Sequence, residues 1–101
     1  MTFLGSPPDL LPSARVFIDA YRVRFPADEM KAYDHYGYEA TNVLLAALEK
    51  VGPDRDKIIA ALAKTDHKGV LGETQFDAKG DTLNHRITLF QVKNGRFEPV
   101  K

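Results

Sequence analysis

The sequence contains no cysteine, which excludes disulfide bonds, thiolate zinc sites and cysteine nucleophiles. It also has no excess of either charge, because 14 Lys and Arg balance 14 Asp and Glu. This balance argues against a dedicated nucleic-acid-binding protein, which usually carries a strong basic excess. No apolar run is long enough to span a membrane, and the first residues lack the basic start and the apolar stretch of a secretory signal. These 101 residues are expected to form one small α+β domain.

Residues that could carry catalysis or bind a metal are few and scattered. His35, His67 and His85 do not have the helical spacing of a metal site, so we interpret them as polar residues at the surface or at helix ends. Neither serine lies in a nucleophile elbow. Three carboxylates lie near the start of one predicted helix, and we interpret them as solvated: Glu29, Asp34 and Glu39. The sequence therefore predicts no enzyme, no metal site and no cofactor.

Apolar periodicity predicts three helices, over about residues 13–24, 33–50 and 54–64. The second has the longest apolar stripe, and Gly52 follows it as a helix-ending glycine. Ser13 is expected to cap the first helix, and Asp54 is expected to cap the third.

After the helices the pattern changes to short strands. Residues 74–77 and 87–92 are predicted strands, and a turn is expected over residues 78–81. Asn94–Gly95 predicts a hairpin turn that leads into a return strand over residues 96–100.

The first twelve residues differ from the rest of the chain in their proline content. Three prolines within residues 1–12 predict a leader that precedes the folded part, residues 13–101.

Three amphipathic helices need an apolar surface to cover, and a few short strands do not supply one. The chain is therefore expected to be a piece of a larger fold or one half of a dimer.

Three of the four tyrosines lie at the start of the longest predicted helix, at Tyr33, Tyr36 and Tyr38. Tyrosines at a helix start can form the wall of a pocket, because each offers an apolar ring and one hydrogen-bonding tip. Packing against a neighbouring sheet is the plainer interpretation of the same spacing.

Five segments in order resemble those of the leucine/isoleucine/valine type of periplasmic binding protein, the receptor of ATP-binding-cassette importers. Residues 32–44 (AYDHYGYEATNVL) resemble the helix start AYxxYGYDAxxVL of that family, and residues 17–25 (FIDAYRVRF) resemble FVxAYKAKF. The other three segments lie downstream and are similar to KVRDALAKT, GVTGPISFDEKGD and YQVKDGKFVPV: residues 57–65, 69–81 and 90–97. The chain departs from the pattern in turn regions, at Glu73 and at Asn84–His85.

The resemblance implies a fragment of an α/β protein with two lobes: the last helices of the first lobe and the strands that run back through the hinge. It implies that Tyr33 lines the side-chain end of the ligand cleft, while Tyr36 and Tyr38 belong to helix packing. The groups that bind the ligand carboxylate and ammonium in the family belong to segments that this chain does not contain.

The implied function is that of the C-terminal part of a receptor for branched-chain or related amino acids. Its implied partners are an amino-acid ligand and the membrane permease of an importer, with no nucleic acid. The parent protein is expected to be periplasmic or otherwise extracytoplasmic. The alternative is a stand-alone interaction module that dimerises through its exposed helix faces, and self-association is expected of the isolated chain in either case.

Overall fold

The computed structural model describes the backbone of residues 2–100 and the side chains of residues 4–100. The described residues form three α-helices and five strands, and this composition confirms the predicted α+β class. In chain order the elements are β1 (Thr2–Leu4), α1 (Arg15–Arg24), α2 (Asp34–Val51), α3 (Arg55–Ala63), β2 (Asp66–Gly69), β3 (Gly72–Gln75), β4 (Ile87–Lys93) and β5 (Arg96–Pro99).

The three helices lie where apolar periodicity places them, and two of their ends follow the predicted chemistry. Gly52 directly follows α2 as its C-cap, and its φ of +82° favours glycine. The side chain of Asp54 caps α3 by accepting a hydrogen bond from the Lys57 N–H at 3.1 Å. The prediction that Ser13 caps α1 is wrong. Ser13 lies in a 3₁₀ turn, and its hydroxyl instead donates to the Val70 carbonyl at 2.9 Å.

The strands form two separate antiparallel sheets. β4 is the centre of one, with β1 on one side and β5 on the other, and β2 pairs with β3 in the second. Asn94 and Gly95 both have positive φ, 53° and 74°, as a two-residue hairpin turn of type I′ requires, so this prediction is confirmed.

Two of the strands were not predicted. β2 has the polar sequence Asp-His-Lys-Gly, in which no apolar alternation marks a strand. β1 lies inside the segment that its prolines mark as a leader, and it pairs with β4 in the register Thr2 with Leu89. The division of the chain at residue 12 remains a prediction, although β1 and the buried side chain of Leu11 both precede it.

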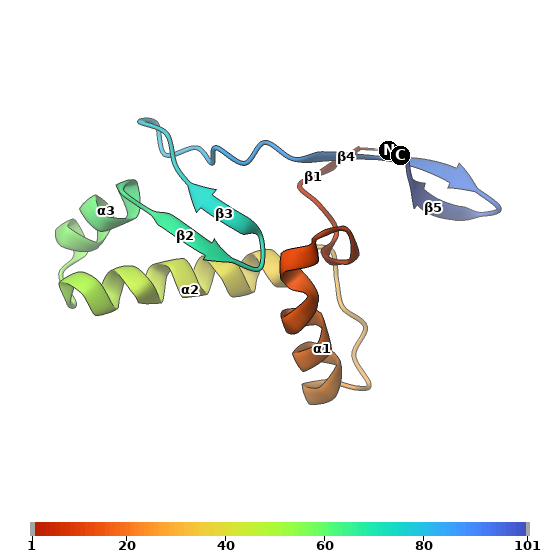
Figure 1. The fold of residues 1–101 in the computed structure, drawn as a ribbon, viewed down its shortest axis with the longest axis horizontal. Coiled ribbons are helices and arrows are strands. Elements are labelled where there is room, and N and C mark those ends of the chain that lie inside the picture. Colours follow the sequence, from red (N-terminus) through yellow and green to blue (C-terminus); the bar gives the residue numbers. More distant parts are fainter. Residues whose placement is uncertain (1, 101) are drawn as a thin grey trace.

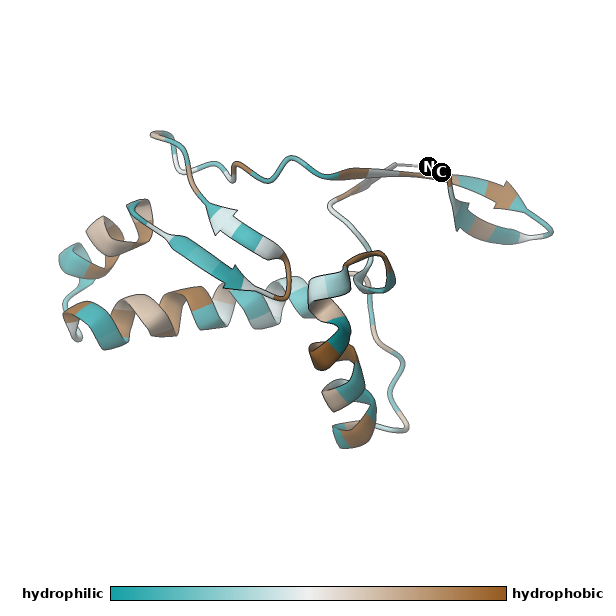
Figure 2. Ribbon diagram, in the orientation of Figure 1, coloured by the Kyte–Doolittle hydropathy of each residue, from teal (hydrophilic) through white to brown (hydrophobic). Residues whose placement is uncertain are grey.

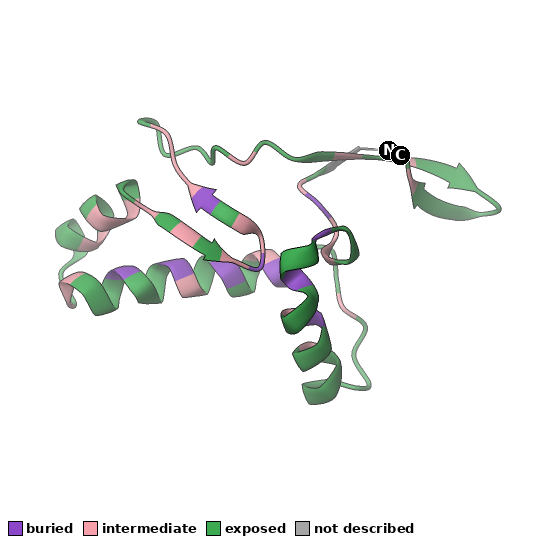
Figure 3. Ribbon diagram, viewed as in Figure 1, coloured by how far each residue is buried: buried purple, intermediate pink, exposed green. Residues whose placement is uncertain are grey.

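The arrangement is elongated rather than centred on one core. Figure 1 shows the β2–β3 hairpin lying along α2, α3 beside the C-terminal end of α2, and the β4–β5 hairpin extending away from the helices. Figure 3 shows that burial is concentrated on the side of α2 that faces the β2–β3 hairpin, and where α1 begins. Among the described side chains, six apolar ones are buried: Leu11, Ala14, Ile18, Val43, Ala47 and Val70.

Much apolar surface is left open. The radius of gyration is 15.8 Å, whereas a compact chain of about 100 residues has a value near 13 Å. Figure 2 shows hydrophobic residues along α2 and on the β4–β5 hairpin, where Leu44, Val92 and Phe97 are exposed. Exposed apolar area on this scale is typical of a surface that another polypeptide covers.

We expect the isolated chain to self-associate, because association would bury apolar faces that its own core does not cover. Sedimentation over a concentration series should give a mass above the 11.3 kDa of the monomer. Ile59→Lys, on the exposed face of α3, should weaken association, whereas Val23→Lys, at an exposed site on α1, serves as the control. A folded species of monomer mass at every concentration would contradict this expectation.

Candidate functional site

Tyr33, the residue that the resemblance places at the ligand, directly precedes α2 at the helix N-cap position. Its side chain is 54% exposed, and its ring packs edge-on against Tyr36, with ring centres 5.7 Å apart and planes at 67°. Tyr33 is thus held by its neighbour on α2 while one side of it faces outward. Its role at a ligand remains a prediction.

Tyr36 belongs to a cluster of hydrogen bonds that ties the start of α2 to the segment after β1. The Ser6 N–H donates to the Tyr36 hydroxyl at 2.9 Å, and His35 Nε2 lies 2.8 Å from the Ser6 carbonyl. On the other side, the Gly5 N–H donates to the Arg86 carbonyl at 2.7 Å and the Thr88 hydroxyl donates to the Gly5 carbonyl at 2.8 Å. We call this cluster the Ser6 junction, and it comprises Gly5, Ser6, His35, Tyr36, Arg86 and Thr88.

Glycine is required at position 5 of this junction. Gly5 has a φ of +113°, a conformation that other residues rarely adopt. A β-carbon there would also come within 2.8 Å of Cζ in the Tyr36 ring. The close approach of backbone to ring is what allows the tyrosine hydroxyl to reach the Ser6 N–H.

We interpret the histidines as polar residues at the surface or at helix ends, and His35 does lie in the first turn of α2. It is fully buried, however, so exposure at the surface is wrong for this residue. Because a carbonyl oxygen only accepts, His35 Nε2 must carry the hydrogen in the bond to Ser6. Its Nδ1 is buried and has no hydrogen-bond partner among the described residues. His35 therefore serves to hold backbone rather than to face solvent.

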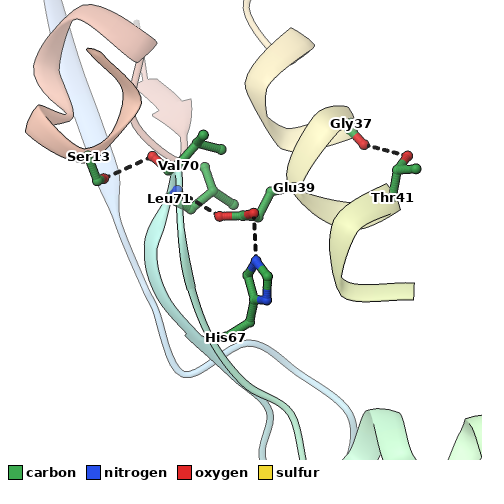
Figure 4. Close-up of polar contacts among 7 residues, drawn as sticks. All are labelled: Ser13, Gly37, Glu39, Thr41, His67, Val70 and Leu71. Carbon is green, nitrogen blue, oxygen red and sulfur yellow. Dashed lines mark hydrogen bonds and ion pairs between the residues drawn. The ribbon is translucent and has the colours of Figure 1, made fainter. Parts of the chain in front are cut away.

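Glu39 is also buried, at 1% exposure, so its interpretation as a solvated helix residue is wrong. Its carboxylate reaches from α2 to the β2–β3 hairpin, as Figure 4 shows, and accepts from the Leu71 N–H at 3.0 Å. Its second oxygen lies 3.0 Å from His67 Nε2 on β2. Burying a carboxylate is costly unless such partners satisfy it, and here each oxygen has one.

Gly69 makes room for this carboxylate. A β-carbon on Gly69 would lie 2.8 Å from Glu39 Cδ, too close for any real contact. The hairpin turn is held from two further directions: the Ser13 hydroxyl donates to the Val70 carbonyl at 2.9 Å, and the Asn84 side-chain amide donates to the Leu71 carbonyl at 3.3 Å. We call the contact of Glu39 with His67, Gly69 and Leu71 the Glu39 anchor.

Beside the Glu39 anchor lies an open groove of about 750 Å³ between α2, α3 and the segment that follows β3. Its lining is mostly apolar and includes Val43, Leu44, Ile59, Leu62 and Phe76. Tyr36 also lines the groove, whereas Tyr33 is not among its lining residues. The groove thus resembles an uncovered core face more than a site built to orient a charged small molecule.

Partial burial raises the pKa of Tyr21, and the carboxylates of Asp34 and Asp28 act in the same direction by disfavouring a phenolate beside them. Within the described part of the chain, no group of three or more His, Asp or Glu side chains is placed to hold a metal ion. No helix in that part combines the length and the apolar character needed to cross a membrane.

Sequence comparison identifies the class of protein. A family model for periplasmic binding proteins matches residues 1–96, so the chain belongs to that family. A search of curated proteins found no match.

Solved structures give more particular likenesses. The crystal structure of the leucine-binding protein LivK from Thermotoga maritima matches 99% of this chain with a TM-score of 0.79 and 31% identity. An ABC transporter substrate-binding protein from Desulfitobacterium hafniense matches 98% of the chain at 26% identity, with a TM-score of 0.73 in its complex with Leu and 0.72 in a second structure. The chain spans only 29–30% of the length of these proteins.

Removing the Glu39 carboxylate should destabilise the protein, because the Leu71 N–H loses its buried partner. Glu39→Ala should lower the free energy of unfolding by about 1–3 kcal/mol, the usual cost of an unsatisfied buried group. Glu39→Gln should cost less, since an amide oxygen can still accept from Leu71. Urea unfolding at one fixed protein concentration measures both, with Glu73→Ala, at an exposed ion pair with Lys68, as the control. Equal stability of all three variants would contradict the anchor.

Gly69→Ala should also destabilise, and the cost should depend on Glu39. In the Glu39→Ala background the clash partner is gone, so the two effects should be less than additive in a double-mutant cycle. Gly37→Ala is the matched control, because a β-carbon on Gly37 meets nothing within 4 Å and alanine favours a helix. Full additivity of Gly69→Ala and Glu39→Ala would show that the carboxylate does not require this glycine.

Proposed function

We propose that this chain is the C-terminal part of a solute-binding receptor for a branched-chain or related amino acid. The observation that carries the proposal is the match of the periplasmic binding protein family to residues 1–96. The likeness of nearly the whole chain to a leucine-binding protein, and to a substrate-binding protein solved with Leu, supports an amino acid as the ligand.

In this proposal the chain contributes part of one lobe and the strands that lead to the other. The parent protein is extracytoplasmic, and it delivers its ligand to the permease of an ATP-binding-cassette importer. Its activity is binding by closure of two lobes on the ligand, without catalysis. The open groove along α2 and α3 is the face that the rest of the lobe covers.

The charges of an amino-acid ligand support the proposal that other segments complete the site. An amino-acid zwitterion carries two charges, and each must meet a partner when it is taken out of water. The buried carboxylate nearest the groove, Glu39, already uses both oxygens within the chain. Tyr33 offers an aromatic ring for the apolar end of a ligand, while partners for the zwitterion come from elsewhere in the parent.

A chimera tests this proposal. Residues 1–101 would replace the aligned part of the Thermotoga leucine-binding protein, which this chain matches over 99% of its own length. We expect calorimetry to show saturable binding of leucine by the folded chimera and none at micromolar concentrations by the isolated chain. A folded chimera that binds none of leucine, valine or phenylalanine would contradict the proposal. Micromolar binding by the isolated chain would contradict the division of the site between segments.

In the chimera, Tyr33→Ala should weaken leucine binding, because the ligand loses an aromatic wall. Burial of a side chain of this kind is worth about 1–3 kcal/mol, or about five- to 150-fold in Kd. Tyr38→Ala is the control, since Tyr38 lies in α2 only five residues after Tyr33 and packs instead against Phe17, with ring centres 4.7 Å apart. If Tyr33→Ala leaves the Kd and the preference among leucine, valine and phenylalanine unchanged, Tyr33 has only a structural role.

A further inference from the structure

The described chain consists of two parts that meet at the Ser6 junction. One part contains the helices and the β2–β3 hairpin, and the other is the sheet β1–β4–β5 (Figure 1). At the junction, all four backbone polar groups of Gly5 and Ser6 are hydrogen-bonded. Gly5 bonds to the sheet side, at Arg86 and Thr88, whereas Ser6 bonds to α2, at His35 and Tyr36.

Tyr36 is the member of this junction that also touches the predicted ligand residue. Its hydroxyl accepts from the Ser6 N–H at 2.9 Å, and its ring packs edge-on against Tyr33 at 5.7 Å. The orientation of the Tyr36 ring is therefore fixed at its tip by Ser6 and on one side by Tyr33. A displacement of Ser6 that preserves this hydrogen bond must also move the ring against which Tyr33 rests.

We propose that Tyr36 is a positioning residue for ligand binding, which couples the ring of Tyr33 to the Ser6 junction and, through Gly5, to the sheet. This inference rests on the proposed function, because it gives Tyr33 a ligand. Ligand binding that immobilises Tyr33 then also steadies the junction between the two parts of the chain. Fixing the junction in turn prepares Tyr33 for the ligand, since such coupling is reciprocal.

The same chimera provides the test, with hydrogen exchange of the Gly5 amide as the reporter. That amide bonds to the Arg86 carbonyl rather than to Tyr36, so removal of the tyrosine hydroxyl does not break its bond directly. We expect leucine to slow exchange of the Gly5 amide in the unsubstituted chimera. Tyr36→Phe should abolish that response and weaken leucine binding by about two- to tenfold, the effect of one hydrogen bond.

Two further variants separate coupling from general destabilisation. Thr88→Val removes the donor to the Gly5 carbonyl from the sheet side, and it should also reduce the response of the Gly5 amide to leucine. Tyr38→Phe removes a hydroxyl from a half-exposed ring on the same helix and should leave both the response and the affinity unchanged.

The outcomes distinguish this inference from the proposed function. If the unsubstituted chimera binds leucine and Tyr36→Phe keeps both the affinity and the slowed exchange, the role of Tyr36 is overturned while the proposed function stands. A folded chimera that binds no amino acid overturns both. A loss of affinity in Tyr36→Phe with an unchanged response of the Gly5 amide also overturns the coupling, because the hydroxyl then acts only locally.

Discussion

The contact of the Glu39 carboxylate with the β2–β3 hairpin is the constraint on which the helical part depends. β2 and β3 are short and polar, and their pairing alone would be marginal in water. The Glu39 carboxylate accepts a hydrogen bond from the backbone N–H of the turn residue Leu71 and contacts the ring of His67. These two contacts fix the hairpin along α2. Because the carboxylate is buried, the hairpin cannot shift without leaving a charge unsatisfied, which is far more costly than losing an apolar contact.

The Ser6 junction fixes the other part of the chain by the same means. His35 and Tyr36 hold both backbone groups of Ser6, and Thr88 holds the Gly5 carbonyl. Two clusters of polar contacts, the Glu39 anchor and the Ser6 junction, thus specify the arrangement, while few apolar side chains are buried to stabilise it. Specific polar contacts with a small core fit the proposed function, in which hydrogen bonds within the chain orient it and the rest of the lobe supplies most of the apolar burial.

The sequence predicts the features that depend on neighbouring residues and misses those that depend on residues far apart in the chain. The helices, the cap at Asp54 and the Asn94–Gly95 turn were predicted because each depends on neighbours in sequence. The burial of His35 and of Glu39 was not predicted because each depends on a partner about 30 residues away in the sequence. β2 was not predicted because its strand conformation depends on pairing with β3. A polar residue beside an apolar helical stripe has the same pattern whether it is solvated or buried against a partner. The sequence does contain Gly69 two residues after His67. This pair indicates a buried carboxylate only when the structure shows that Glu39 lies against both residues.

The resemblance to a family of receptors predicts a ligand and a ligand-binding residue, Tyr33, which the spacing of residues alone does not. The structure accounts for the position of Tyr33 but not for a complete ligand site. Tyr33 is fixed by α2 and Tyr36, which are local to the chain. A ligand between two lobes also needs the opposite wall and partners for its charges, and no arrangement of these 101 residues alone supplies a second lobe. Under the proposed function, the contribution of this chain is to position one aromatic ring, Tyr33, by means of buried polar contacts at the start of α2. In the proposed function, selectivity would then depend on how closely segments outside these residues approach that ring.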